Sequence, residues 1–310
     1  MFWGKPPFNP ETDISDLSGK VIIVTGGNTG LGKETIMELV KHKPKRVFLA
    51  ARTASKAEAA ISEIKAMTPD ANVTHLSLDL MSFDSIKNAS SQFQSQSDRL
   101  DVLLNNAGIM ATPPAKTTEG YESQFGTNHM GHALFTKLLL PTLLKTAEQP
   151  NSDVRIVNLT SEGHNMAPTG GIIFDTDKLL TYGAWTRYGQ SKLANVLFTK
   201  GLAKHYPQIT SVSVHPGVIL TDLYAAQNQN VLFKYSIGVV SKFAFSGLKQ
   251  GTFNSLWACT AEKDKLENGA YYKPVGLKSA GSPMTGYARD EKLADQLWDW
   301  TEEEFKKHGI

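Results

Sequence analysis

Tyr188 and Lys192 stand four positions apart in the run YGQSKLAN, which predicts part of a helix. Residues with this spacing project from the same helix face, so the ammonium can stabilise the phenolate form of the tyrosine. A tyrosine has an ordinary pKa of roughly 10, and it exchanges protons readily at neutral pH only beside positive charge. The pair therefore indicates acid–base chemistry on an oxygen of a small molecule.

Two more polar residues suit the same chemistry. Ser161 follows a strand-like run and can hydrogen-bond the reacting oxygen, although Thr160 competes for this role. Asn128 precedes a helix expected near Gly131. Each residue also has a structural alternative: a packed tyrosine beside a solvated lysine, a serine that begins a turn, an asparagine helix cap. Their order along the chain, at the carboxyl ends of expected parallel strands, favours a joint site.

A glycine-rich turn directly follows the first strand-like run. Residues 25–32 have the sequence TGGNTGLG, and a helix is expected to begin within it. Glycines let the backbone approach a pyrophosphate closely, and the N–H groups at the helix start face its negative charge. The alternative is a glycine-rich turn that holds no ligand. The residues assigned to this phosphate cradle are Thr25, Gly26, Asn28, Thr29, Gly30, Leu31 and Gly32.

The end of the second strand-like run bears on the choice of dinucleotide. A preference for NAD(H) calls for Asp or Glu at this point to bond the ribose hydroxyls, but Arg52 follows two alanines here. A guanidinium suits a 2′-phosphate and can stack on adenine, and Lys56 adds positive charge. The alternative is that Arg52 begins a solvated loop. The missing carboxylate and the cation together favour NADP(H).

Short apolar runs rich in β-branched residues alternate with longer amphipathic stretches, as in a parallel sheet covered by helices on both faces. Near-continuous apolar character in the second, fourth and fifth runs implies burial on both faces. This predicts an α/β fold of the Rossmann type, with a doubly wound parallel sheet. The expected strands are 21–25, 47–51, 73–78, 102–105, 155–159, 211–215 and 269–272, and the expected helices are 31–41, 56–67, 82–94, 131–146, 188–205 and 249–259.

No repeat or linker divides the chain, so residues 1–310 are expected to form a single Rossmann-type domain. Residues 1–18 form an irregular lead-in in which Pro6, Pro7 and Pro10 break any helix. Residues 225–246 are an insertion between a strand and a helix, where such folds place a substrate lid. Aromatic residues in this insertion suit an apolar substrate pocket, a small core of its own, or contact with a membrane surface.

The motifs together resemble the short-chain dehydrogenase/reductase family over nearly the whole chain. The T-G-x-x-x-G-x-G turn, the N-N-A-G run at 105–108 and the Tyr–Lys pair match the family pattern, and so does the Pro-Gly pair at 216–217 with Thr221. The segments LAAR, NNAG, TNHMGHALFT and YGQSKLAN are most similar to the retinol dehydrogenase-like branch and to fungal short-chain reductases. Ser161 and Tyr188 are 27 positions apart, more than in the common small members, which leaves the pocket shape there open.

The resemblance implies roles for further residues. Asn128 would hold a water that connects Lys192 to solvent. Asp79 and Leu80 would lie beside adenine, and Val218 with Thr221 would contact the nicotinamide carboxamide. Asn105 would line the cofactor groove, or alternatively stabilise the end of its strand. The cofactor residues implied in this way are Asp79, Leu80, Asn105, Ala107, Gly108, Tyr188, Lys192, Pro216, Gly217, Val218 and Thr221.

Composition excludes several other classes of protein. The 310 residues carry 32 basic and 30 acidic side chains, a net charge of +2 that argues against a nucleic-acid binder. The single cysteine excludes an internal disulfide and is typical of a reducing, cytoplasmic setting. Lys234 and Lys242 interrupt the most apolar long stretch, so no transmembrane segment is expected, while peripheral membrane contact stays open. His129, His132 and His164 lack a carboxylate pattern, so no metal site is expected.

The expected function is NADP(H)-dependent interconversion of a carbonyl (ketone or aldehyde) and an alcohol on a hydrophobic small molecule, with Tyr188 as the acid–base group. Reduction is the expected direction if NADPH is the physiological form. One alternative is reduction of an activated C=C bond, as in the related light-dependent protochlorophyllide reductases. Another is a cofactor-binding regulatory protein without turnover. A homodimer through helices 131–146 and 188–205 is left open.

Overall fold

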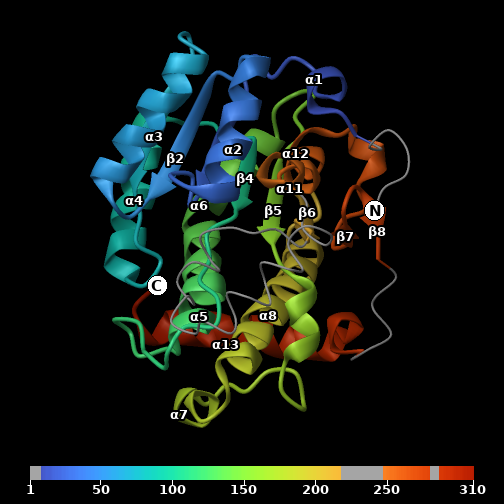
Figure 1. Cartoon of the computed structure of the whole chain (residues 1–310). Helices are drawn as coiled ribbons and strands as arrows, with labels where there is room; N and C mark the ends of the chain where they lie inside the picture. Colours follow the sequence, from blue (N-terminus) through green and yellow to red (C-terminus); the bar gives the residue numbers. More distant parts are fainter. Residues whose placement is uncertain (1–7, 218–246, 280–285) are drawn as a thin grey trace.

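A single mixed sheet organises the part of the chain that the structure, a computed structural model, describes: residues 8–217, 247–279 and 286–310. The strand order is β3-β2-β1-β4-β5-β6-β7-β8, and all neighbours are parallel except β7 and β8. Helices cover both faces (Figure 1), so the expected α/β Rossmann-type fold is confirmed. The strands are β1 Val21–Thr25, β2 Arg46–Ala51, β3 Val73–Ser77, β4 Val102–Asn105, β5 Arg155–Leu159, β6 Thr210–Val214, β7 Tyr271–Lys273 and β8 Leu277–Lys278.

The central strands form where apolar residues run without interruption. β1, β4 and β5 have the bounds expected from the sequence, and every residue in them is buried. The other expected strands differ by one or two residues at their ends, and the short antiparallel β8 was not expected. Because β1 to β7 are parallel, their carboxyl ends meet at one edge of the sheet, where the candidate site residues lie.

The helices follow the expected pattern with several differences. The stretch expected at 249–259 consists of two short helices that meet at Thr252. The short helices α5 and α7 and a helix at the C-terminal end, α13, were not expected. The helices are α1 Pro10–Asp13, α2 Gly30–Leu39, α3 Ala54–Met67, α4 Phe83–Gln96, α5 Ser123–Phe125, α6 Gly131–Ala147, α7 Thr176–Leu180, α8 Ala184–His205, α11 Leu248–Gly251, α12 Phe253–Thr260 and α13 Glu291–Lys307, with a π-helical turn at Gly126–Met130 and 3₁₀ turns at Val40–His42, Glu162–Met166, Lys263–Lys265 and Tyr287–Arg289.

A further difference concerns the lead-in at 1–18, which is not irregular throughout. Pro10 begins the short helix α1, and Asn9 caps it by accepting a hydrogen bond from the N–H of Glu11 at 3.2 Å. Proline is tolerated in the first turn of a helix because its missing N–H would have no helical partner there. The expectation that Pro10 breaks any helix was therefore wrong. The expected lid at 225–246 lies outside the described residues.

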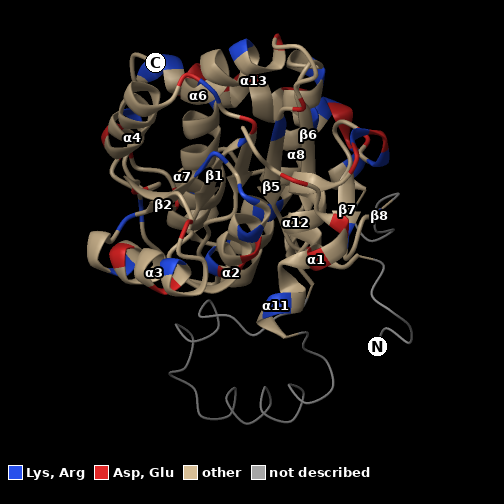
Figure 2. Cartoon of the chain, turned by 90° about the horizontal axis from the view of Figure 1, so that it is seen from above, with Lys and Arg blue, Asp and Glu red and all other residues tan. Residues whose placement is uncertain are grey.

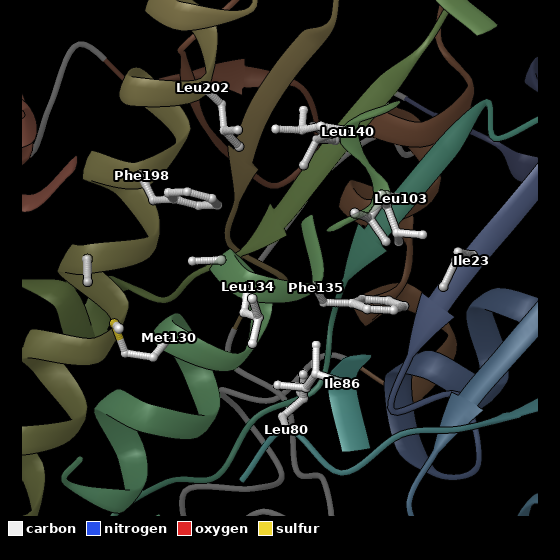
Figure 3. Close-up of a cluster of buried hydrophobic side chains, with 14 of the residues drawn as sticks. Ile23, Leu80, Ile86, Leu103, Met130, Leu134, Phe135, Leu140, Phe198 and Leu202 are labelled. Atoms are coloured by element: carbon white, nitrogen blue, oxygen red, sulfur yellow. The ribbon is translucent and has the colours of Figure 1, made fainter. Parts of the chain in front are cut away.

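The sheet separates two hydrophobic layers. Ile22 and Val24 of β1 face the layer formed with α2, α3 and α12, whereas Ile23 faces the layer formed with α4, α6 and α8. Figure 3 shows the second layer, in which Phe135 of α6 and Phe198 of α8 point toward the sheet. These layers hold α6 and α8 against the strands whose ends carry the site.

Helix α13 packs across α8, as Figure 1 shows. Asp290 caps it by accepting a hydrogen bond from Leu293 N at 3.0 Å. Trp298 stacks on Phe198 with ring centroids 5.8 Å apart, and a Cβ on Gly201 would lie 2.4 Å from the Trp298 ring. Part of the face of α8 considered for a homodimer is thus covered within the chain.

Charged side chains are spread over the surface. Figure 2 shows Lys and Arg interspersed with Asp and Glu on the helices, in keeping with the balanced composition. Nineteen ion pairs join residues of the described ranges 8–217, 247–279 and 286–310, and most of them are at least partly exposed. Within those ranges no helix combines the length and the apolar character needed to cross a membrane.

Candidate active site

A groove of about 510 Å³ opens at the carboxyl edge of the sheet, and the turn 25–32 forms one wall of it. Gly26 and Gly30 have φ of +66° and +51°, in the left-handed region that favours glycine. A Cβ on Gly32 would lie 2.4 Å from the backbone oxygen of Gly26, so only glycine allows this close approach. The lining residues are Thr25, Gly26, Asn28–Gly32, Ala50–Thr53, Lys56, Leu78–Met81, Asn106–Ile109, Thr127 and Leu159.

The start of α2 faces this groove, and its first backbone N–H groups have no hydrogen-bond partner among the described residues. Thr29 occupies the N-cap position but makes no side-chain cap hydrogen bond. The first N–H groups of a helix have no helical partner, and they carry the positive end of the helix dipole. A narrow glycine cradle with free N–H groups fits a pyrophosphate, so the residues present suit a dinucleotide.

Arg52 and Asp79 lie at the ends of neighbouring strands, β2 and β3, and both line the groove. Arg52 Nη1 is 4.0 Å from Asp79 Oδ2, and the Arg52 side chain is 67% exposed. Asp79 Oδ1 also accepts a hydrogen bond from Met81 N at 3.0 Å. The guanidinium is thus held loosely at the rim of the groove, where it can still contact an anionic group.

A smaller cavity of about 90 Å³ adjoins the groove and contains the expected acid–base residues. It shares several lining residues with the groove, which places the two spaces side by side. The Tyr–Lys pair comes from α8, and Ser161 follows β5. The lining residues are Leu31, Asn106, Gly108–Met110, Leu159–Ser161, Tyr188, Lys192 and His215–Gly217.

Tyr188 and Lys192 are both buried on α8, one turn apart. The Lys192 Nζ atom lies 5.8 Å from the centre of the Tyr188 ring and donates a hydrogen bond to the backbone oxygen of Leu159 at 3.1 Å. Burial lowers the pKa of Lys192 to about 8, so its ammonium is still largely charged at neutral pH. A positive charge thus lies beside the tyrosine ring.

Two glycines let the segment after Ser161 pack directly on α8. A Cβ on Gly163 would lie 2.8 Å from Tyr188 Cε1, and one on Gly189 would lie 2.6 Å from the backbone of Met166. The Ser161 hydroxyl accepts a hydrogen bond from Gly163 N at 3.0 Å and caps this turn. Its proton can still be donated into the cavity. The serine therefore begins a turn and also faces Tyr188 across the cavity.

Asn128 lies within the π-helical turn that precedes α6, not at a helix end. Its Oδ1 accepts a hydrogen bond from Ile109 N at 2.8 Å, and its Nδ2 donates to Ile109 O at 2.9 Å and to Ser191 Oγ at 2.8 Å. Ser191 Oγ in turn donates to Tyr188 O at 2.8 Å. The asparagine therefore connects the segment after β4 to the helix that carries Tyr188. The structural alternative, a helix cap, does not describe these contacts.

Comparison with known proteins gives the family. Residues 20–232 match the family model described as short chain dehydrogenase. The chain belongs to the short-chain dehydrogenase/reductase family. It is 40% identical to the short-chain dehydrogenase/reductase drtF of Aspergillus calidoustus, over 96% of this chain and 97% of the relative. It is 38% identical to retinol dehydrogenase 12 of Mus musculus, over 91% of this chain and 85% of that protein.

The resemblance drawn from the sequence is thereby confirmed, including its fungal and retinol dehydrogenase-like relatives. Among solved structures, a protein from Mycobacterium paratuberculosis superposes with a TM-score of 0.71 at 27% identity, covering 96% of each chain. This short-chain dehydrogenase/reductase is thus an oxidoreductase by family, and the family binds a nicotinamide cofactor.

In this short-chain dehydrogenase/reductase, most expected cofactor residues line the groove. These are Thr25, Gly26, Asn28–Gly32, Arg52, Lys56, Asp79, Leu80, Ala107 and Gly108. Pro216 and Gly217 line the smaller cavity, and Val218 and Thr221 lie outside the described residues. The groove also includes residues that the sequence interpretation left out, among them Asn106, Ile109 and Thr127, each of which adjoins an expected site residue in sequence.

Asn105 requires a correction. It is 2% exposed and is absent from the groove lining, because its Nδ2 points inward and donates to Thr136 Oγ1 at 3.1 Å and to Asn158 Oδ1 at 2.8 Å. The side chain thus links β4 to α6 and β5. Its structural alternative, stabilising the strand end, describes it better than contact with the cofactor.

His129, His132, His164 and the single cysteine, Cys259, are buried. Burial lowers the pKa of His129 to about 3 and that of His132 to about 4, so both imidazoles are neutral. Among residues 8–217, 247–279 and 286–310 no group of three or more metal-ligating side chains occurs. His215 also lines the small cavity. Burial raises the pKa of the Cys259 thiol to about 12, which leaves it unreactive.

Proposed function

We propose that this chain is an NADP(H)-dependent oxidoreductase that interconverts a carbonyl, either a ketone or an aldehyde, and an alcohol on a hydrophobic small molecule. The observation that carries the proposal is the cavity that Ser161, Tyr188 and Lys192 line together, directly beside the groove. It brings an acid–base group, a hydrogen-bond donor and a positive charge to one small space.

The groove fits a dinucleotide, and each wall would hold a different part of it. The glycine turn 25–32 and the free N–H groups of α2 would hold the pyrophosphate. When bound, the nicotinamide supplies or accepts the hydride. Pro216 and Gly217, which line the cavity beside Tyr188, would bound the space on that side.

The residues at the cavity would each have a separate role in the reaction. Ser161 would donate its hydroxyl proton to the carbonyl oxygen and orient it. Tyr188 would give its phenol proton to the same oxygen in reduction and take it back in oxidation. Lys192 would stabilise the phenolate through its charge, which its pKa of about 8 preserves at neutral pH. Asn128 would hold the water through which a proton returns from solvent.

Two features favour NADP(H) over NAD(H). β2 ends in two alanines, so it offers no carboxylate for the ribose hydroxyls. Arg52 is mostly exposed at the groove rim, and Lys56 lines the same wall. Two cations at this place suit the 2′-phosphate.

A hydrophobic substrate is favoured by the surface around Tyr188. Trp185 is 39% exposed and packs edge-on against the Tyr188 ring, with centroids 6.2 Å apart. Met166 is 41% exposed and lies on the adjoining turn. Exposed large apolar side chains beside a cavity mark binding surfaces. Retinol dehydrogenase 12, one of the relatives, is named for an apolar alcohol.

An NADPH-oxidation screen over aldehydes, ketones, quinones and enones, with products identified, tests this function. We expect alcohol products, and loss of nearly all turnover in Tyr188→Phe with cofactor binding retained. Saturated ketones from enones would establish C=C reduction instead. Tight NADPH binding without turnover of any carbonyl or alcohol would establish a cofactor-binding regulatory protein.

Arg52→Asp tests the choice of cofactor. We expect it to weaken NADPH use sharply while sparing NADH, because the carboxylate repels the 2′-phosphate. Lys33→Met is the matched control, since Lys33 is a nearby cation at the start of α2 that pairs with Glu63 and does not line the groove. An unchanged preference in Arg52→Asp would refute the assignment. A cytoplasmic location stays a prediction of the sequence, which leaves peripheral membrane contact and a homodimer open.

A further inference from the structure

The buried histidine His132 contacts both halves of the candidate site. It lies in the first turn of α6 and is 2% exposed. Its Nε2 is 2.8 Å from Thr25 Oγ1, and its Nδ1 is 3.0 Å from the backbone oxygen of Asn128. Thr25 ends β1 and begins the glycine turn, whereas Asn128 belongs with the acid–base residues. One imidazole thus bridges the cofactor cradle and the expected catalytic residues.

The contact with Asn128 fixes the proton on the imidazole. A backbone carbonyl oxygen can only accept hydrogen bonds, so His132 Nδ1 must carry a proton and donate it to Asn128 O. A neutral imidazole has one N–H, which leaves Nε2 as an acceptor toward Thr25.

The contact with Thr25 leads independently to the same tautomer. Thr25 Oγ1 accepts hydrogen bonds from Asn106 N and Ala107 N, each at 2.9 Å, and these occupy both of its lone pairs. The single hydroxyl proton must therefore be donated. His132 Nε2 at 2.8 Å is the nearer acceptor, compared with Leu104 O at 3.4 Å. Both ends of the bridge require the proton on Nδ1.

The buried surroundings of His132 keep it neutral. Burial lowers its pKa most, the Lys192 ammonium lowers it further, and only the hydrogen bond to Asn128 O raises it. A second proton on Nε2 would also point at a hydroxyl oxygen whose lone pairs are already used. The imidazole therefore stays neutral and keeps both hydrogen bonds over the ordinary pH range.

Each end of the bridge continues toward the reacting groups. Through Thr25 it holds the N–H groups of Asn106 and Ala107, two residues of the groove. Through Asn128 it continues to Ser191 Oγ and from there to Tyr188 O, at 2.8 Å for each step. Displacing the imidazole would shift the cradle and Tyr188 relative to each other.

We propose that His132 is a positioning residue which, as the neutral Nδ1–H tautomer, sets the separation between the glycine cradle at Thr25 and the Asn128–Ser191–Tyr188 chain. It touches neither substrate nor cofactor and acts through these partners. This role rests on the proposed function, because it aligns the cofactor with the proton donor.

His129 provides a matched control on the preceding turn. It is as buried as His132 and also neutral. Its Nε2 lies 3.3 Å from Thr301 Oγ1 on α13, and its Nδ1 has no partner among the described residues. The contact with Thr301 does not lead to the glycine cradle. Replacing either histidine by leucine removes a buried imidazole, but only one replacement breaks the bridge.

The first experiment compares His132→Leu with His129→Leu. We expect both to lower the melting temperature, but only His132→Leu to lower kcat/KM, on the order of 10- to 100-fold, and to weaken NADPH binding measured by fluorescence. Equal losses of kcat/KM and NADPH affinity in the two variants would show a merely structural role and overturn the proposal.

Two conservative variants separate the ends of the bridge. His132→Asn retains a donor near the Nδ1 position, so we expect it to restore part of kcat relative to His132→Leu. His132→Gln can present its amide oxygen to Thr25, so we expect it to restore part of the NADPH affinity. If neither variant recovers more than His132→Leu, the bridge does not act as proposed.

Nitrogen-15 NMR of the wild-type imidazole reports the tautomer without any turnover. We expect the proton of His132 on Nδ1 and an unprotonated Nε2; the opposite assignment would overturn the proposal. A wild-type protein that reduces no carbonyl would refute the proposed function alone, because the tautomer and the NADPH affinities of the variants are measured independently of the reaction.

Discussion

Two buried cations flank Tyr188 on α8, and their surroundings differ sharply. Arg187 is 1% exposed and donates to Glu122 Oε1 at 2.6 Å, to Tyr182 O at 3.2 Å and to Thr112 O at 2.9 Å. Lys192 is 4% exposed and donates to Leu159 O alone among the described residues. The first cation is fully compensated, and the second is not.

The region around Arg187 has the features of a scaffold. Glu122 is itself completely buried, and its second oxygen accepts a hydrogen bond from Phe125 N at 2.8 Å, which caps α5 ahead of the π-turn. The ion pair therefore ties the start of α8 to the segment that leads to Asn128. A buried charge with a close partner and saturated hydrogen bonds holds geometry without being reactive.

The region around Lys192 has the features of a reactive site. No carboxylate lies within ion-pair distance of its ammonium in the part of the chain that the structure describes. Burial therefore lowers its pKa to about 8. A buried charge left without a counterion costs stability, and proteins tolerate this mainly where the charge serves chemistry. The contrast supports a structural role for Arg187 and agrees with the catalytic role that we propose for Lys192.

Breaking the compensated pair gives the largest expected effect. Glu122→Gln leaves the Arg187 charge buried without a counterion, which we expect to lower the free energy of unfolding by about 3–5 kcal/mol. The double variant Glu122→Gln/Arg187→Met removes both charges and should recover part of that loss. Urea unfolding monitored by circular dichroism measures both variants. A double variant no more stable than Glu122→Gln would contradict the scaffold role.

Removing the uncompensated charge should have the opposite effect on stability. Lys192→Met avoids burying an ammonium, and Leu159 O keeps its hydrogen bond from Asn195 Nδ2 at 3.0 Å. We expect the variant to be more stable than wild type at pH 7, on the order of 2 kcal/mol, and to lose nearly all turnover. Unfolding experiments measure the expected gain in stability, and the activity assay measures the expected loss of turnover. A variant that is both inactive and less stable would show that Lys192 is structural.

The stability that Lys192→Met gains over wild type should depend on pH, which separates Lys192 further from Arg187. The pKa of Lys192 is about 8 in the folded chain, below the ordinary value near 10.5 that applies when unfolded. Between these values the unfolded state binds more protons, so this group makes the wild type more stable as pH rises. The stability gap between Lys192→Met and wild type should therefore be largest below pH 8 and close toward pH 10.5. A gap independent of pH would contradict the lowered pKa.

Local patterns in the sequence account for much of the fold and of the candidate site. β1, β4 and β5 have the expected bounds because their apolar runs are continuous and buried on both faces. The turn 25–32 was expected because glycine is required there by its φ angles and close contacts. Tyr188 and Lys192 were expected to share a face because the helix period alone places them one turn apart.

What the sequence could not predict depends on contacts between distant segments. Glu122 and Arg187 are 65 positions apart, and nothing local to either residue indicates a buried pair. The bridge from Thr25 to His132 spans 107 positions. Asn105 was assigned to the groove through the family resemblance, but its side chain turns inward. In α13, by contrast, the buried residues Leu293, Leu297 and Phe305 follow the helical period, which is a local signal for that helix.

A third cation, Lys137, is partly exposed, and its removal should have the smallest effect on the free energy of unfolding. Lys137 of α6 lies 2.6 Å from Glu302 of α13, but both side chains are about 30% exposed. Water and salt screen such a pair, and its contribution is typically about 0–1 kcal/mol. We expect Lys137→Met to change the free energy of unfolding by no more than this, with the change shrinking as salt is added and with turnover unaffected. A loss approaching that of Glu122→Gln would mean that the contact with α13, rather than burial of the charge, decides how much an ion pair on these helices stabilises the fold.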